Sequence, residues 1–202
     1  MRAPRQGSDD GSSSSALDAL VQRARVGDRA AFADLVRIHR GEVQRVALRL
    51  VGNHEDAEDI AQETFVRAWR GLALHRGDGR FGAWLLGITV HLARDLQRRR
   101  GQGPETDAAA LLESIDAAPN RSPGDSESRR EQQRLVEAAI AALPERLRTA
   151  LVLRAFEGQP YEEIGRITGV RPATVRTRLV EARRALRRLL GRHVGEGEGG
   201  ER

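Results

Sequence analysis

The chain has 202 residues, a formal net charge of +5, 39% hydrophobic residues and no cysteine. The missing sulfur excludes disulfide scaffolds, cysteine-ligated zinc sites and thiol catalysis. No apolar run approaches the roughly 20 residues that span a bilayer, and the opening segment lacks the apolar core of a secretory signal, so we expect a cytoplasmic protein without membrane insertion.

Charge is distributed unevenly along the chain, and every basic residue is an arginine. Codon usage in a GC-rich genome is enough to explain that choice, but it still supplies planar donor groups suited to phosphates and guanine edges. Residues 16–104 sum to +4, residues 105–127 to −5 and residues 128–193 to +8. Two basic blocks therefore flank an acidic one, a pattern that indicates a polyanionic partner.

Composition also divides the chain into segments. The two ends are rich in Ser or Gly and cannot bury apolar area, whereas the middle segment is rich in Gly, Pro, Asp and Ser. We expect a disordered tail, a helical domain, a flexible acidic linker, a second helical domain and a disordered tail, at residues 1–15, 16–100, 101–128, 129–193 and 194–202.

The first helical block shows helical periodicity and almost no strand-like alternation, so the fold class is predicted to be all-α. The pattern predicts a short helix at residues 17–24, a second helix that begins after the N-cap Asp28 and ends at Gly52-Asn53, and a third from about residue 55 to 71. A fourth repeats apolar residues at Phe81, Trp84/Leu85, Ile88, Leu92 and Leu96. Four such amphipathic helices can form one bundle.

The third predicted helix has a second face away from its core. Asp59, Gln62, Glu63 and Val66 follow the spacing 0, 3, 4 and 7, which places them on one side. Such a face suits a basic partner helix, although spacing alone favours a merely solvated acidic face. A metal site among the acidic residues that begin this helix is disfavoured, because consecutive side chains point in different directions and already favour the helix dipole.

The fourth predicted helix carries a polar face opposite its apolar stripe. A solvated basic helix and a nucleic-acid contact both fit this face, whose members are His91, Arg94, Asp95, Arg98 and Arg99. Phe81 and Trp84 could stack on an unpaired base, but their register with Ile88 favours packing in the core.

The second helical block ends in a short helix, a glycine-containing break and a long arginine-rich helix. The short helix is predicted at residues 161–167, and the long one starts at Ala173 or Thr174 and runs to about Leu190. The apolar stripe of the long helix is Val175, Leu179, Ala182, Leu186 and Leu189. This arrangement is a helix-turn-helix, in which the second helix enters a major groove. The candidate DNA-reading residues are Arg171, Thr174, Arg176, Thr177, Arg178 and Arg183. A solvated face of a bundle helix is the alternative, and the turn spacing argues against it.

Catalytic groupings are missing from the pattern. No Ser-His-Asp set, phosphate-binding glycine loop or pair of catalytic carboxylates can be assembled. We therefore expect no enzymatic activity, no catalytic residue, no metal and no cofactor.

Two stretches resemble a known family. The segments Glu58-Asp59-Ile-Ala-Gln-Glu-Thr-Phe-Val-Arg-Ala-Trp69 and Phe81 through Arg100 resemble region 2 of the extracytoplasmic-function (ECF) sigma factors of bacterial RNA polymerase. Leu143-Pro144-Glu145-Arg146, Tyr161-Glu-Glu-Ile164 and Gly169 through Leu179 resemble their region 4. Two places depart from the family pattern: His91 stands where Asn is usual, and Arg171-Pro172-Ala173 replaces Pro-x-Gly.

The resemblance implies a sigma factor that directs core RNA polymerase to promoters. The face with Asp59, Gln62, Glu63 and Val66 would bind the coiled coil of the polymerase β′ subunit. The fourth helix would read and help to melt the minus-ten element, and the helix-turn-helix would read the minus-thirty-five element. The resemblance also implies an anti-sigma factor as a partner.

The predicted linker bears on how both elements could be reached together. A flexible coil of its 28 residues averages about 26 to 32 Å end to end, whereas major-groove sites two helical turns apart are separated by about 70 Å. A third body that holds the two domains apart is expected, and core polymerase fits that role. A helix-turn-helix repressor or activator that works without polymerase is the alternative, and an enzyme acting on nucleic acid is a more distant one.

Overall fold

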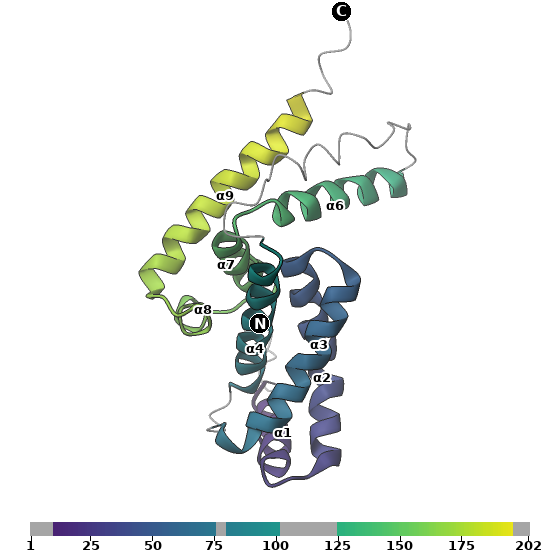
Figure 1. Cartoon of the computed structure of the whole chain (residues 1–202), viewed down its shortest axis with the longest axis vertical. Coiled ribbons are helices and arrows are strands. Elements are labelled where there is room, and N and C mark those ends of the chain that lie inside the picture. The colour runs from purple at the N-terminus through teal and green to yellow at the C-terminus, as the bar shows by residue number, and fades with distance from the viewer. Residues whose placement is uncertain (1–9, 76–79, 102–124, 196–202) are drawn as a thin grey trace, which may run out of the picture.

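The structure, a computed structural model, describes residues 10–75, 80–101 and 125–195. All regular elements in these ranges are helices, which confirms the predicted all-α class. Figure 1 shows helices α1 to α4 in one half of the molecule and helices α6 to α9 in the other. The predicted linker lies mostly between Gly101 and Asp125, outside the described residues, as does most of each predicted tail.

The N-terminal half is a bundle whose helices begin and end close to the predicted signals. Asp28 caps the second helix by accepting a hydrogen bond from the Ala31 N–H at 3.0 Å. Gly52 ends the same helix with φ of 81°, a left-handed conformation that favours glycine. The elements are α1 (Asp10–Arg25), α2 (Arg29–Val51), α3 (His54–Gly71), the 3-10 turn η1 (Leu72–Leu74) and α4 (Phe81–Arg99).

The buried face of α4 differs from the predicted stripe. Ile88, Leu92 and Leu96 are only half-buried, and the buried residues are Phe81, Leu85, Leu86, Thr89, Val90, Ala93 and Gln97. The reason is that α4 packs against α2 and α3 on one side and against α8 on another, so it buries a different and wider arc. The polar members of this arc are satisfied: Thr89 donates to the Leu85 carbonyl at 2.9 Å, and Gln97 donates to the Leu50 carbonyl at 2.7 Å.

The C-terminal half contains the predicted helix-turn-helix. Its helices are α6 (Asp125–Ala141), α7 (Glu145–Ala155), α8 (Tyr161–Thr168) and α9 (Pro172–Gly195). Val175, Leu179 and Ala182 of α9 are buried, and α9 packs against α7 and α8. The stripe predicted for the long helix is therefore the one that holds α9 in place.

Three helices extend beyond the boundaries predicted from composition. Helix α1 begins at Asp10, inside the expected tail, and α6 begins at Asp125, inside the expected linker. Helix α9 continues to Gly195. Once a helix is anchored further along, each added residue gains one backbone hydrogen bond, so the helix can extend into a segment poor in apolar residues. No helix in the described ranges is long and apolar enough to cross a membrane.

The two halves pack against each other. Helix α4 contacts α8, and α2 contacts both α6 and α7. One continuous cluster of buried apolar residues crosses the boundary, with Val46, Leu50, Leu86 and Val90 from the first half and Ile140, Leu143, Leu147 and Ile164 from the second. The sequence predicts two domains joined by a linker, and it contains no signal for this shared core.

Candidate nucleic-acid and protein interfaces

The outer surface of α9 carries the residues predicted to read DNA. Val175 and Leu179 are buried, and their burial determines which face of α9 is turned toward solvent. Of the candidates, Arg178 is half-buried and the others are exposed, namely Arg171, Thr174, Arg176, Thr177 and Arg183. The structure therefore leaves the predicted set accessible on α9, with Arg171 in the turn directly before it.

A tight turn places α9 relative to α8, and a glycine that the sequence analysis did not single out makes it possible. The Val170 N–H donates to the Gly165 carbonyl at 2.9 Å. A Cβ built on Gly165 would lie only 2.7 Å from the Val170 carbonyl oxygen, so a side chain does not fit there. Gly169 completes the turn with φ of 71°. Both glycines are needed for α9 to leave α8 at this angle.

Tyr161 of α8 holds two arginines near the turn. The Arg154 guanidinium carbon lies 5.1 Å from the centroid of the Tyr161 ring, and that of Arg176 lies 5.9 Å from it. These distances are within the range of a cation–π contact. Arg176 is thus drawn toward α8, whereas Arg178 lies on the other flank of the buried stripe.

The outer face of α3 is also assembled as predicted. Asp59, Gln62 and Val66 are exposed, and Glu63, which is half-buried, accepts a hydrogen bond from the Arg67 Nε at 2.8 Å. A shallow cavity of about 280 Å³ separates this face from α4, and it is lined by Asp56, Asp59, Ile60, Glu63, Arg67, Leu92, Asp95, Leu96 and Arg99. The predicted acidic face and part of the predicted DNA-binding face therefore border one groove.

An ion pair ties the end of α4 to the start of α3. Arg100 binds both carboxylate oxygens of Asp56, with a distance of 2.7 Å between its Nη2 and Oδ1. Asn53 also donates to this carboxylate, and its own side chain accepts from the Asp56 N–H at 2.9 Å. The hydrogen bond from Asn53, and then the Arg100 guanidinium, lower the pKa of Asp56. The groove between α3 and α4 is thus held at one end by a fixed charge pair.

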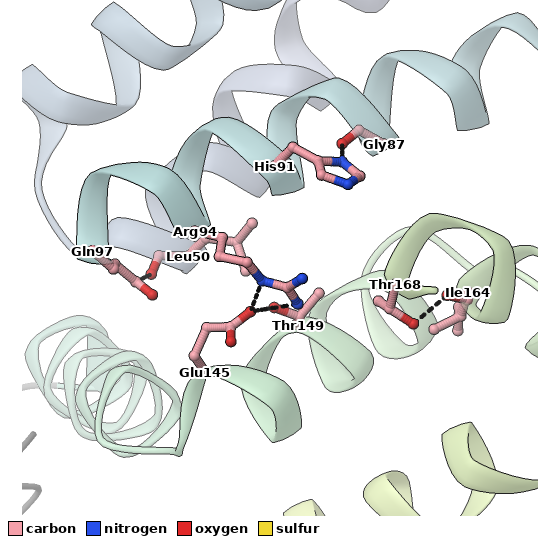
Figure 2. A network of polar contacts seen from close by, with 9 residues as sticks. All are labelled: Leu50, Gly87, His91, Arg94, Gln97, Glu145, Thr149, Ile164 and Thr168. Atoms are coloured by element: carbon pink, nitrogen blue, oxygen red, sulfur yellow. Dashed lines mark hydrogen bonds and ion pairs between the residues drawn. The ribbon is translucent and has the colours of Figure 1, made fainter. Parts of the chain in front are cut away.

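The candidate residues on α4 lie in two different environments. His91 is exposed, and its Nδ1 donates to the Gly87 carbonyl at 2.6 Å (Figure 2). This bond leaves Nε2 as the outward nitrogen of the ring. Arg98 and Arg99 are exposed, whereas Asp95 is half-buried and accepts from Arg98 at 3.2 Å.

Arg94, by contrast, points toward the second half of the molecule. Its Nε and Nη2 donate to Oε1 of Glu145, at the start of α7, at 3.2 and 3.1 Å. Thr149 donates to the same oxygen at 3.4 Å, and Figure 2 shows the three side chains meeting between α4 and α7. The residue predicted to contact DNA is therefore engaged by the helix-turn-helix domain.

A larger cavity, of about 540 Å³, lies between α4 and α8. Trp84, Ile88 and His91 line it from α4, and Glu163, Arg166 and Ile167 line it from α8. Phe81 is 2% exposed and belongs to the core, whereas half-buried Trp84 is on the cavity wall. The core packing predicted for both aromatic side chains is therefore complete for Phe81 and only partial for Trp84.

A third contact between the halves contains a buried carboxylate that lies close to an arginine but has no hydrogen bond to it. The Arg49 guanidinium carbon lies 4.0 Å from the centroid of the Phe156 ring, but its Nη1 is 4.0 Å from Oε1 of Glu157, too far for a hydrogen bond. The Glu157 side chain is 5% exposed. Burial raises the pKa of Glu157, Glu42 adds to the rise, and Arg45 and Arg49 oppose it.

Sequence reasoning missed Arg49, Glu145 and Glu157 as interface residues. Each of these residues contacts a residue from the other half of the chain, as Arg94 contacts Glu145. Periodicity within one helix cannot reveal such a pair. In the described ranges, no three His, Cys, Asp or Glu side chains are grouped so that they could hold a metal ion.

Comparison with known proteins gives matches in both halves. Residues 35–102 match the family model described as Sigma-70 region 2, and residues 133–186 match the one described as Sigma-70, region 4. The ECF RNA polymerase sigma factor SigE of Mycolicibacterium smegmatis is 42% identical over 176 residues, which span 84% of this chain and 66% of the relative. The RNA polymerase sigma-H factor of Pseudomonas aeruginosa is 37% identical over 177 residues, which span 85% and 92%.

Solved structures also match. The structure of CnrH in complex with the cytosolic domain of CnrY has a TM-score of 0.66 and 28% identity, and the match covers 87% of this chain and 97% of that one. A sigma factor RpoE from Bartonella quintana, solved with the anti-sigma factor NepR, has a TM-score of 0.62 at 24% identity and supports the fold.

Proposed function

Since the chain belongs to the ECF family of sigma factors, we propose that it directs core RNA polymerase to promoters by reading two separate DNA elements. The observation that carries this proposal is the pairing, in one chain, of an exposed acidic face on α3 with an exposed arginine-rich recognition helix. The first is suited to a protein partner and the second to DNA. A repressor or activator that acts alone has no need of the first.

We assign polymerase binding to α3. Asp59, Gln62 and Val66 are exposed beside the groove along α4, so a basic helix of the partner can reach the carboxylate and the apolar end together. The occupant proposed here is the β′ coiled coil of core polymerase. RNA synthesis then belongs to the core, and this chain supplies no catalytic residue, metal or cofactor.

The minus-ten element is assigned to α4. His91 offers an outward ring nitrogen, and the exposed Arg98 and Arg99 continue the same surface with positive charge. Opening a promoter requires bases to leave the stack, which costs a few kcal/mol per base, so charge and apolar surface near the strand must compensate. Arg94 and Asp95 complete the proposed set. Trp84 lines the larger cavity together with His91.

The minus-thirty-five element is assigned to α9. Side chains in the first turns of a recognition helix reach base edges, and later ones mostly reach phosphates. We therefore assign base contacts to the surface around Thr177, with Arg171, Thr174, Arg176 and Arg178 beside it, and a phosphate contact to Arg183. The proposed domains are residues 16–100 and 129–193, with the linker at residues 101–128 between them.

An anti-sigma factor is a further proposed partner, and it rests on the neighbour RpoE of Bartonella quintana, whose structure is a complex with the anti-sigma factor NepR. We place the whole system in the cytoplasm, where the promoter DNA and the polymerase are. Run-off transcription with purified core enzyme on a library of genomic promoters tests the function directly. Promoter-specific transcripts that need this chain would support it. Specific DNA binding that neither needs nor recruits core would contradict it.

A further inference from the structure

The outward face of α9 includes two residues that the candidate set leaves out. Val175, Leu179 and Ala182 are buried, and a helix turns by about 100° per residue, so the direction opposite this buried stripe is determined. Among residues 173–184, those within about 50° of that direction are all exposed, namely Ala173, Thr177, Val180, Glu181 and Arg184. Val180 and Glu181 therefore continue, one turn further along the helix, the surface around Thr177 to which base contacts are assigned.

Arg176 and Arg178 lie on the two flanks of this outward face. Relative to the buried Val175, Arg176 is turned by about 100° in one direction and Arg178 by about 60° in the other. A recognition helix presents its outward centre to the base edges and its flanks to the DNA backbones. A long arginine can reach a base or a phosphate from a flank, whereas a shorter side chain has to lie near the centre to touch a base.

Val180 offers an apolar contact to the groove. Its side chain is 41% exposed and has no hydrogen-bonding group, so it cannot bind a phosphate or recognise a base nitrogen or oxygen. The apolar feature that the major groove presents is the C5-methyl group of thymine. Contact between Val180 and that methyl group removes apolar surface of both partners from water, which is favourable. This side chain therefore suits a thymine.

Glu181 offers a hydrogen-bond acceptor in a helix that is otherwise basic. It is the acidic residue of α9, whose other charged side chains are arginines, and it is exposed. A carboxylate only accepts hydrogen bonds and is repelled by the negative phosphates, so the complementary group on DNA is a base amino group. Cytosine presents its N4 amino group in the major groove, whereas adenine places the acceptor N7 beside its N6 amino group. An ionised carboxylate at this position therefore favours cytosine.

The two residues are about 100° apart around the helix axis, on opposite sides of its outward centre, and about 1.5 Å apart along it. Base pairs are stacked about 3.4 Å apart, so the two side chains meet neighbouring base pairs. We propose that Val180 and Glu181 are specificity-determining residues of α9, Val180 by contact with the methyl group of a thymine and Glu181 by accepting a hydrogen bond from the N4 amino group of a cytosine. The proposal rests on the DNA-reading role assigned above to α9, and it adds the bases that this helix selects.

Selection of DNA by the full chain tests this assignment directly. A library of duplexes randomised over the length of a promoter is incubated with the chain and core polymerase, and the bound duplexes are recovered and sequenced. We expect the selected upstream element to contain a thymine and a cytosine at neighbouring base pairs. An element that lacks either base would overturn the role of the residue that is proposed to read it.

Each substitution should change the preference at one position of the selected element. Glutamine forms two hydrogen bonds with adenine, at N6 and N7, so Glu181→Gln should switch the preferred base from cytosine to adenine and lower the preference for cytosine about five-fold or more. Val180→Ala should lower the preference for thymine about two- to four-fold, because apolar contact is lost. The matched controls are Glu162→Gln, at an exposed glutamate of α8, and Val136→Ala, at a valine of α6 that is also 41% exposed.

The controls and a second readout keep the possible failures apart. Loss of a negative charge alone should strengthen binding to all sequences, in Glu162→Gln as in Glu181→Gln, whereas a switch from one base to another requires contact with that base. If each α9 variant selects the same bases as its control, the inference is wrong. Run-off transcription from the selected duplexes by the unaltered chain with core polymerase tests the proposed function separately. Duplexes that are selected but not transcribed would refute that function, while the selected bases would still decide the inference.

Discussion

Gly165 offers a sharp test of how the recognition helix is positioned. In Gly165→Ala the new methyl group would lie 2.7 Å from the Val170 carbonyl oxygen and 3.7 Å from the Pro172 ring. The first is a backbone atom that cannot rotate away, so the turn itself must open. Overpacking of this kind costs about 1 to 3 kcal/mol, and the gain in helix propensity returns about 0.5 to 1 kcal/mol. We expect a net loss of about 1 to 2 kcal/mol.

A glycine-to-alanine substitution inside α4 should instead make the protein more stable. Gly87 lies inside α4, and a Cβ built there meets no atom within 4 Å, so Gly87→Ala should stabilise by about 0.5 to 1 kcal/mol. For a chain of this length each kcal/mol shifts Tm by about 2 to 4 °C. Thermal unfolding followed by circular dichroism should therefore show a fall of about 2 to 8 °C for Gly165→Ala and a rise of about 1 to 4 °C for Gly87→Ala.

A functional measurement separates a shifted turn from a simple loss of stability. Well below the melting temperature, Gly165→Ala should still bind core polymerase but lose transcription from promoters that depend on the minus-thirty-five element. If Gly165→Ala is as stable as the unaltered chain and transcribes normally, the turn does not require glycine and the reasoning from its geometry fails.

Three further predictions concern the surfaces. Asp59→Arg or Gln62→Ala should weaken binding to core polymerase in a pull-down and change stability by no more than about 0.5 kcal/mol, since both side chains are exposed; unchanged binding by both would remove this face from the interface. Arg176→Ala and Arg178→Ala should affect transcription differently on templates with single-base changes in the minus-thirty-five element. One arginine is expected to read a base, which is worth about 1 to 3 kcal/mol of discrimination, and the other to bind a phosphate. Uniform losses of transcription in both variants would place the specificity on other residues. Packing of the two halves against each other should strengthen as pH falls from neutrality toward the ordinary glutamate value of 4.5. The raised pKa of Glu157 makes the packed arrangement take up a proton, and this favourable effect is lost as pH rises through that raised pKa. The melting temperature measured against pH should show this trend, Glu157→Gln should flatten it, and an equal trend in both proteins would assign it to another group.

Local signals predicted local structure well. The carboxylate of Asp28, the glycine at position 52 and the spacing of Val175 and Leu179 each act within a few residues of the chain, so the helices they begin, end or orient follow from the sequence. The assignment of both matched regions to a sigma factor is likewise confirmed by the comparisons. The site residues on α3, α4 and α9 remain predictions.

What could not be predicted depends on contacts between distant segments. The buried face of α4 was predicted only in part: Phe81 and Leu85 are buried as expected, but Leu86 and Val90 join a core to which the second half contributes. Nothing in the spacing of that helix distinguishes a side chain that faces α2 from one that faces α8. The partner of Arg94 and the requirement for glycine at position 165 were missed for the same reason, since both arise only when separate elements come together.

The apolar cluster shared by the two halves has a consequence for the life of the protein in a cell. When the halves separate, Leu86 and Val90 on one side and Leu143 and Leu147 on the other lose part of the cover that buries them. Contiguous apolar surface of this kind promotes aggregation and attracts chaperones and proteases. An opened chain without polymerase would then be short-lived, so that the amount of active protein would follow the amount of polymerase ready to receive it.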